Sequence, residues 1–221
     1  MPTELDSKDG ILIRTMTVAD YQPLKTLMGG NFFKGEPLGE LYEPEWVIKF
    51  KDEYYISMIE QGTCLLAVDE NNGGRIVGYV LAHAQTPDDL DRDRKRAAAS
   101  EPNTWEDILV FLSRVDIEVN LFKRYGISEL LFSFMTHVVA PMRGKGLGSR
   151  LAAALMEIGR KKGFPLMVAQ CISYYSARQK EALGMECAYS IAYADYKDES
   201  GQVVFKPAAP HTHLRVMVIK L

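Results

Sequence analysis

The chain has 221 residues, of which 47% are hydrophobic and 25% are charged, and this composition indicates a globular protein that forms one domain over residues 1–221. A net charge of -3 and a pI near 5.9 exclude the strongly basic surface that binds nucleic acid. The sequence has no apolar stretch near the roughly 20 residues that span a bilayer and no apolar signal-peptide core in its first ten residues, so we expect no membrane partner and a cytoplasmic location.

Hydrophobic periodicity predicts alternating strands and helices in the N-terminal half. The predicted elements are a strand at 11–14, helices at 17–28 and 44–59, and a hairpin of strands at 63–68 and 75–84 around a turn at 71–74. Thr17 or Asp20 caps the first helix, and Gly29 with Gly30 is expected to end it. Residues 85–104 carry charges of both signs and are predicted to be an inserted loop or helix end.

The C-terminal half continues the alternation. Its predicted elements are a helix at 105–125, a strand at 130–139, a helix from 147, a strand from 166 to 171, a short helix at 173–184 and closing strands at 186–196 and 214–219. The strand at 130–139 is largely apolar, which is typical of a strand covered on both faces. The three cysteines (Cys64, Cys171 and Cys187) are expected to be reduced thiols, and no Cys/His metal spacing occurs.

A glycine-rich turn separates the strand at 130–139 from the next helix. Its glycines stand at 144, 146 and 148 beside the cations Arg143 and Lys145. Such a turn exposes backbone N–H groups at the positive end of a helix, which suits a phosphate. Lys145 is followed by Gly146 rather than by Ser or Thr, which excludes a Walker A loop, and the G-x-G-x-G spacing differs from a dinucleotide fingerprint.

Two pairs of motifs resemble a known superfamily. Arg143-x-x-Gly146-x-Gly148, together with the segment from Tyr175-Ser176-Ala177 to Leu183-Gly184-Met185, resembles the GNAT superfamily of acyl-CoA-dependent N-acyltransferases. Phe32-Phe33-Lys34-Gly35-Glu36-Pro37-Leu38 and the later Phe205-Lys206-Pro207 resemble its insect arylalkylamine (dopamine) N-acetyltransferase branch. The resemblance implies an α/β (α+β) fold: a mixed, mostly antiparallel central sheet with helices on both faces, in which two central strands splay apart to form the acyl-CoA cleft.

The resemblance also implies acetyl-CoA as cosubstrate and no metal. The residues expected to bind it are Thr136, His137, Val138, Val139, Arg143, Gly144, Lys145, Gly146, Leu147, Gly148, Ser149 and Arg178. Arg143 and the loop N–H groups would hold the pyrophosphate, while Lys145 either contacts it or stays solvated. Arg178 would reach the 3′-phosphate or the adenine. The residues from Thr136 to Val139 would flank the pantetheine through their backbone, and the His137 side chain is expected to be structural.

Acyl transfer to an amine needs a base, because a primary amine is mostly protonated at pH 7. Glu36 is the candidate base, since aromatic neighbours would raise its pKa by desolvation; the alternative is a surface Glu before Pro37. Either His211 or His213 could assist or replace it. Pro37, Phe33, His211 and His213 are the expected amine-pocket residues, although both histidines could be ordinary loop residues.

Three hydroxyl groups are candidates to protonate the departing thiolate. They are Ser173, Ser176 and Tyr175, with Tyr174 able to exchange roles with Tyr175. Ser173 either acts in this way or only caps the helix. Some relatives carry Ser where this chain has Ile172, which puts a serine relay in doubt. Direct attack by the amine needs no nucleophile from Cys171.

These features predict a monomeric acetyl-CoA-dependent N-acetyltransferase that acts on arylalkylamines such as dopamine, tyramine, octopamine, serotonin or tryptamine. One alternative is an enzyme for polyamines or agmatine, or for longer acyl-CoA donors. Another is an acyl-CoA-binding protein without turnover. A protein acetyltransferase is less favoured, because it would need an open groove for a peptide.

Overall fold

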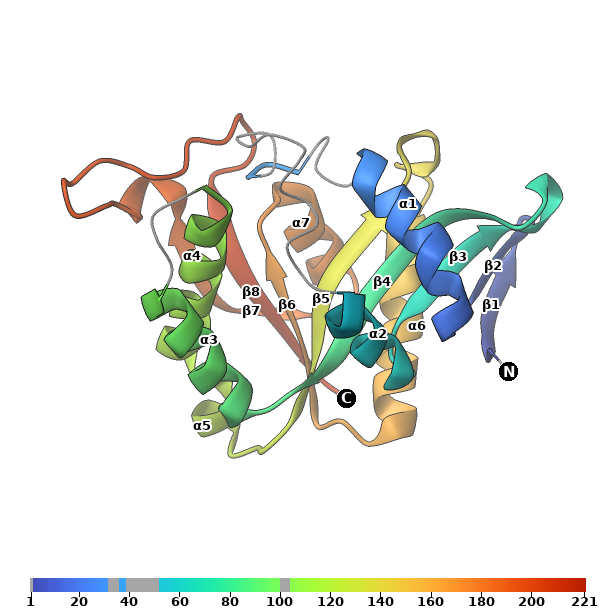
Figure 1. Ribbon diagram of the computed structural model, residues 1–221, viewed down its shortest axis with the longest axis horizontal. Helices are drawn as coiled ribbons and strands as arrows, with labels where there is room; N and C mark the ends of the chain where they lie inside the picture. Colours follow the sequence, from blue (N-terminus) through green and yellow to red (C-terminus); the bar gives the residue numbers. More distant parts are fainter. Residues whose placement is uncertain (1, 32–35, 39–51, 100–103) are drawn as a thin grey trace.

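The computed structural model describes residues 2–31, 36–38, 52–99 and 104–221. Its centre is an eight-stranded sheet in the order β1-β2-β3-β4-β5-β6-β8-β7 (Figure 1). The strands are β1 (Glu4–Lys8), β2 (Ile11–Thr15), β3 (Leu65–Asp69), β4 (Arg75–Gln85), β5 (Leu130–Val138), β6 (Leu166–Cys171), β7 (Glu186–Ala192) and β8 (His213–Lys220). Every neighbouring pair is antiparallel except β5 and β6, which are parallel.

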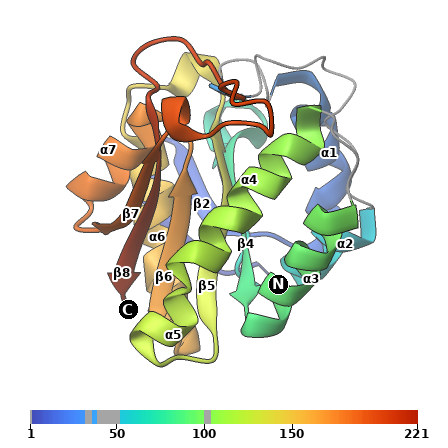
Figure 2. The ribbon, with the colours of Figure 1, turned by 90° about the vertical axis from the view of Figure 1, so that its left-hand side faces the viewer.

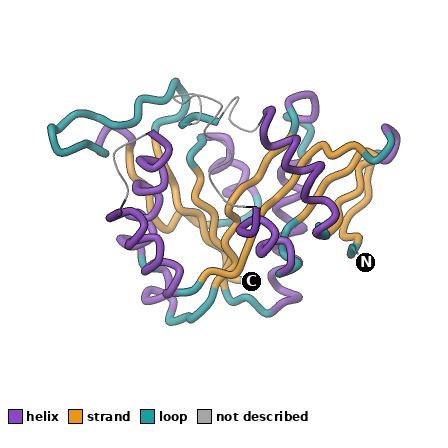
Figure 3. Tube along the Cα trace, in the orientation of Figure 1, coloured by secondary structure: helices purple, strands orange, loops and turns teal. Residues whose placement is uncertain are grey.

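Helices cover both faces of this sheet (Figures 2 and 3). They are α1 (Tyr21–Asn31), α2 (Asp52–Glu60), α3 (Pro87–Ala99), α4 (Thr104–Val119), α5 (Leu121–Tyr125), α6 (Leu147–Lys162) and α7 (Tyr174–Ala182). The core clusters place α6 and α7 on one face and α1, α2, α4 and α5 on the other. This arrangement confirms the predicted mixed, mostly antiparallel sheet with helices on both faces. None of the described helices is long and apolar enough to cross a membrane.

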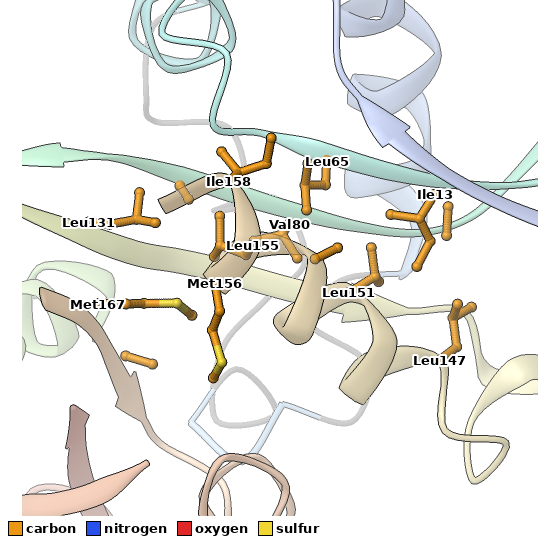
Figure 4. Packing of buried hydrophobic residues seen from close by; sticks show 14 of the residues in the cluster. Ile13, Leu65, Val80, Leu131, Leu147, Leu151, Leu155, Met156, Ile158 and Met167 are labelled. Carbon is orange, nitrogen blue, oxygen red and sulfur yellow. The ribbon is translucent and has the colours of Figure 1, made fainter. Parts of the chain in front are cut away.

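Helix α6 packs along the sheet through one apolar stripe. Its buried residues Leu147, Leu151, Leu155 and Ile158 recur at helical spacing and meet Ile13, Leu65, Val80 and Leu131 from four adjacent strands (Figure 4). Burying each such side chain stabilises the fold by about 1.5–3 kcal/mol. The stripe therefore fixes the start of α6, and with it the glycine-rich turn, against the middle of the sheet.

The strand β1 is a feature that the sequence analysis missed. It forms a hairpin with β2 around Asp9 and Gly10, whose φ angles are 53° and 74°. An Asp-Gly pair with two positive φ values is the usual sequence for a two-residue hairpin turn. The signal was therefore present, but the polar sequence of β1 hid it.

The prediction of an inserted loop at 85–104 is wrong for most of that segment, because Pro87–Ala99 is helix α3. Proline is favoured in a first helical turn, and the backbone N–H and the hydroxyl of Thr86 both donate to the Asp89 carboxylate at 2.7 Å. This capping arrangement starts a helix that the dense charge pattern disguised.

Three helix boundaries also differ from the prediction. Helix α1 passes through Gly29 and Gly30 to Asn31 rather than ending at the glycines. The predicted helix at 105–125 is divided at Asn120. Asn120 adopts a left-handed backbone conformation, with φ 37°, and is the N-cap residue of α5. Of the predicted helix at 44–59, residues 44–51 lie outside the described part of the chain, and α2 begins at Asp52.

The two parallel strands separate over most of their length. Only Leu131 with Met167 and Phe132 with Val168 are paired between β5 and β6. Beyond these pairs β5 stays with β4 as far as Val138, and β6 stays with β8 as far as Cys171. Figure 1 shows the two strands diverging. The predicted splay of the central strands is thus present.

A β-bulge lies where the strands separate. Leu81 pairs with Met135, but the next residue of β4, Ala82, pairs with Ser133, so Phe134 is the extra residue of β5. A bulge bends its strand and re-aims the side chains after it. The part of β5 that follows the bulge, residues 135–138, therefore turns away from β6.

Candidate active site

A large cavity occupies the place where β5 and β6 part. Its volume is about 1110 Å³, and its lining comes from β5, the end of β6, the glycine-rich turn, the starts of α6 and α7, and the inner side of α4. This volume is at the upper end of the roughly 300–1,000 Å³ that is usual for small-molecule sites. The cavity is therefore large enough for a sizeable small-molecule ligand.

The glycine-rich turn lies on one wall of this cavity. Gly144 and Gly146 have φ angles of 73° and 78°, and Gly146 is the N-cap of α6 with no side chain from the described residues bonded to the cap. The first N–H groups of a 16-residue helix are thus directed to the cavity. Arg143 donates from Nε to the Val138 carbonyl at 2.9 Å, which keeps the cation beside the turn.

Two contacts hold the start of α6 in place. A Cβ atom on Gly148 would lie 2.4 Å from Gln179 Nε2, so α7 packs directly on this turn. On the other side, Arg150 donates from Nε to Asp6 Oδ2 at 2.6 Å and from Nη2 to the Ile11 carbonyl at 2.9 Å. The start of α6 is therefore fixed to both the N-terminal hairpin and α7.

Glu36 is partly buried and lines the same cavity. Burial raises the pKa of its carboxyl to about 7, although the Arg143 charge acts in the opposite direction. Leu38, fully buried, belongs to the same apolar cluster as Phe205 and Tyr193. The two sequence strings that resemble the arylalkylamine branch thus meet in one cluster, which anchors the turn that carries Glu36.

The end of β6 and the start of α7 bring together the predicted hydroxyl groups. Ser173 caps α7, accepting at its Oγ from the Ser176 N–H at 3.0 Å, and Ser176 Oγ donates to the Ser173 carbonyl at 2.9 Å. Tyr175 lines the cavity mouth with 65% of its surface exposed. His211 accepts at Nδ1 from the Tyr174 N–H at 3.2 Å, which ties the C-terminal loop to α7.

His137 has a packing role. Its ring is 4% exposed and stacks on Tyr79, with centroids 5.4 Å apart. Burial, assisted by the Arg143 charge, lowers the pKa of His137 to about 4. A neutral, stacked imidazole agrees with the expectation of a structural side chain.

Most predicted site residues that the structure describes line the cavity. These are Glu36, Thr136, His137, Val138, Arg143, Gly144, Gly146, Leu147, Gly148, Ser149, Ser173, Tyr175, Ser176 and His211. Five others lie elsewhere: Pro37 and Val139 are buried, Lys145 and His213 are exposed, and Arg178 points outward to pair with Glu181 at 2.9 Å. Phe33 lies outside the described residues.

Three groups of cavity residues were missed by the sequence analysis. One is an aromatic wall, defined here as Tyr54, His83, Phe132 and Phe134. Phe134 meets Tyr54 edge-on at 6.1 Å, and His83 meets Phe132 at 5.7 Å. No local signal marks this wall, because its members come from α2, β4 and β5.

The second missed group is a partly buried carboxylate on α4. Asp116 Oδ1 accepts from Gln170 Nε2 at 2.6 Å, and burial, together with the Asp93 charge, raises the pKa of Asp116 to about 7. Asp116 falls among the apolar positions of α4, close to Leu112 and Val115. An acidic residue near such an apolar stripe is the available sequence signal.

The third missed residue is Lys180, which lines the cavity and is 3% exposed. It stands three residues after the buried Ala177, on the inner face of α7. A lysine at a core position of a short helix was the signal that could have identified it. Within the described residues no cluster of ligands suited to a metal ion occurs.

Similarity to solved structures agrees with this geometry. No family model matches the chain. An agmatine N-acetyltransferase mutant in its apo form is 29% identical, with a TM-score of 0.86 over 96% of this chain and 100% of that one. The Drosophila melanogaster polyamine N-acetyltransferase, which forms N-acetylagmatine, is 30% identical, with a TM-score of 0.85 over the same shares. A mosquito arylalkylamine N-acetyltransferase-like protein, 5b, is 27% identical, with a TM-score of 0.82 over 96% and 100%.

The splayed sheet, the glycine-rich turn and these likenesses define an acyltransferase of the GNAT fold. The chain belongs to the GNAT superfamily of N-acetyltransferases, in the branch that contains the insect arylalkylamine and polyamine enzymes.

Proposed function

We propose that this enzyme transfers the acetyl group of acetyl-CoA to the primary amine of a small arylalkylamine, with Glu36 as the general base. The observation that carries the proposal is the Glu36 carboxyl, whose pKa is raised to about 7, in one cavity with a phosphate-binding turn. We also keep the predictions, made from the sequence, that the enzyme is monomeric and cytoplasmic.

The chain's residues fit CoA as the ligand of the glycine-rich turn. Gly146 and the first turn of α6 offer uncapped N–H groups to an anion, and Arg143 adds a positive charge. The edge of β5 that β6 leaves unpaired offers backbone groups to the amides of pantetheine. When bound, acetyl-CoA would supply the acetyl group as a thioester that the amine attacks.

Glu36 has the proton affinity that the proposed role needs. A primary alkylamine, with a pKa near 10.4, is almost fully protonated at neutral pH and must lose a proton before it can attack. A carboxyl with a pKa of about 7 is half ionised there, yet is a much stronger base than an ordinary Glu. Burial also raises the pKa of the Cys171 thiol, which disfavours an acyl-enzyme on Cys171 and supports direct attack.

The aromatic wall supports an arylalkylamine as acceptor. Its rings line the cavity beside β5, where offset or edge-on contacts with a substrate ring contribute about 0.5–1.5 kcal/mol beyond area burial. A relative described as arylalkylamine N-acetyltransferase-like is 27% identical to this chain.

A second candidate substrate class is agmatine or a polyamine. Asp116 lines the same cavity with Asp89 and Asp93, so this part of the cavity carries a surplus of carboxylates over its one arginine, Arg92. A second cation on the acceptor would stabilise an ionised Asp116. The relatives that are 29% and 30% identical are described as agmatine and polyamine enzymes.

An amine panel with acetyl-CoA, measured by thiol release, tests these proposals. We expect turnover of arylalkylamines, with Phe134→Ala raising their KM about 10-fold through the lost ring contact.

If the acceptor is a dication, Asp116→Asn should instead raise its KM about 10-fold or more, because a charge-assisted hydrogen bond is lost. The KM for acetyl-CoA is the internal control. CoA binding in calorimetry without thiol release on any amine would identify a non-catalytic binding protein.

A further inference from the structure

Lys180 is a buried cation that the proposed chemistry has not used. Among the described residues it is the one lysine that is almost fully buried, with 3% of its surface exposed. Lysines are almost never fully buried unless they are paired, because taking an ammonium group out of water is unfavourable. Its side chain nevertheless lines the cavity that would hold both substrates.

The contacts of Lys180 leave its charge poorly compensated. Nζ donates to the neutral Gln179 Oε1 at 3.2 Å. A Cys171 thiolate would favour the ammonium form, but burial raises the pKa of Cys171, so its thiol carries no charge at neutral pH. The adjacent carboxylate, Glu181, is bonded to Arg178 at 2.9 Å and to Arg215 at 3.1 Å. Burial consequently lowers the pKa of Lys180 below its ordinary value.

Lys180 lies on the side of the cavity where the acetyl-CoA would bind. The side chain of its neighbour Gln179 occupies the space that a side chain on Gly148 would fill. This part of α7 therefore packs against the start of α6, where the phosphate would bind. Cys171 and Ser176, beside it, also line the cavity at the end of β6. The ammonium thus lies on the wall shared by the glycine-rich turn and the end of β6.

We propose that Lys180 binds the sulfur of CoA and protonates it as the thiol leaves, an inference that rests on acetyl-CoA being the donor. As the amine nitrogen bonds to the acyl carbon, the carbon–sulfur bond breaks and its electron pair stays on sulfur. A proton moves from Lys180 Nζ to that sulfur, giving CoA thiol and a neutral lysine, which regains a proton from solvent. The substrate ammonium gives its first proton to Glu36 before it attacks, and Glu36 releases that proton to solvent. The nitrogen then gives its second proton to Glu36 as the amide forms.

The other candidates for this proton are less well placed. Ser173 Oγ accepts the N–H that caps α7, and Ser176 Oγ donates to the Ser173 carbonyl. Tyr175 is 65% exposed at the mouth of the cavity. Lys180 alone among these groups brings a positive charge to a desolvated thiolate, where electrostatic stabilisation is strongest.

Binding measurements with CoA and with desulfo-CoA, which lacks the sulfur, test this proposal. At pH 9 we expect the wild type to bind CoA about 10-fold more tightly than desulfo-CoA, as a charge-assisted contact implies. Lys180→Met should remove this preference and leave the affinity for desulfo-CoA unchanged. The ultraviolet absorbance of bound thiolate should titrate at a lower pH in the wild type than in the variant. Lys161→Met, on the exposed end of α6, is the matched control.

The outcomes separate this proposal from the proposed function. Binding of neither ligand would overturn CoA as the donor, and with it both proposals. Binding of both with equal affinity by the wild type at pH 9 would overturn only the role of Lys180, and this comparison does not depend on whether a variant folds. Lys180→Arg, which keeps the charge, should retain part of the preference for CoA; loss equal to that of Lys180→Met would contradict a charge contact.

Discussion

The Glu36 carboxyl is under two opposing influences, burial in the cavity and the nearby Arg143 charge. Because burial dominates, its pKa lies near 7, and only the ionised form can accept a proton from the amine. The kcat/KM profile should therefore rise through a pH of about 7. Glu36→Gln should lower kcat/KM by roughly 10²–10⁴-fold and remove that rising limb. Wild-type rates across the pH range in the variant would exclude Glu36 as the base.

Lys180 offers a second prediction at the scale of one residue. Its pKa is lowered by burial, so the folded state is penalised wherever the unfolded chain is protonated. The penalty is greatest at low pH, where the lysine is charged in both states, and disappears as the pH rises toward the ordinary lysine value near 10.4. Lys180→Met should therefore stabilise the fold at pH 7, by about 1–4 kcal/mol in chemical denaturation, with the gain shrinking at higher pH.

Whether Lys180→Met raises or lowers the free energy of unfolding distinguishes a functional lysine from a structural one. A lysine kept for catalysis reduces stability where it sits, so its removal stabilises the protein while CoA recognition is lost. A structural lysine would show the reverse, with a loss of stability in the variant. Lys161→Met, a surface change, should leave the unfolding curve unmoved.

At the scale of the element, helix α6 carries a matched pair of glycines at its two ends. Gly146 and Gly163 have φ angles of 78° and 80°, and a Cβ on either would meet nothing within 4 Å. Alanine at each should thus destabilise the fold by a similar 1–2 kcal/mol or so, from backbone strain alone. We expect only Gly146→Ala to weaken CoA binding in calorimetry, because only that end faces the cavity. Equal loss of affinity in both variants would contradict an anion site at the turn.

The elements also show which sequence signals are strong. The apolar stripe of α6 and the largely apolar sequence of β5 gave correct positions, because the buried residues of both elements pack in the core. Segments with few buried residues were harder. The polar hairpin strand β1 and the charged helix α3 are specified by a turn and a cap, Asp9-Gly10 and Thr86 with Asp89, which periodicity does not detect.

At the scale of the whole molecule, two carboxyls make stability depend on pH in the same direction. Glu36 and Asp116 both have pKa values raised to about 7 from ordinary values of 4.5 and 3.8. The folded state therefore binds more protons than the unfolded chain between those limits. Their contribution is complete below pH 4 and is lost as the pH rises through 7. Denaturation from pH 5 to pH 8 should show this fall, and Glu36→Gln with Asp116→Asn should flatten it.

The predicted site divides by how its residues are brought together. Residues within contiguous motifs, such as Arg143 with Gly146 or Ser173 with Ser176, were found because spacing along the chain fixes their geometry. Glu36 was found through the resemblance of its segment to a family motif, together with its aromatic neighbours in the sequence. The aromatic wall and Asp116 escaped notice, since strand register and helix packing assemble them from distant segments.

The two register pairs between β5 and β6 have a mechanical consequence. They join one block of five strands to another of three, so the sheet is a pair of stiff bodies connected at a narrow seam. The seam consists of Leu131, Phe132, Met167 and Val168, all of them buried. The angle between the two blocks sets the width of the cavity between β5 and β6. Since Phe132 belongs both to this seam and to the cavity lining, apolar packing at the seam shapes the space in which the proposed substrates would meet.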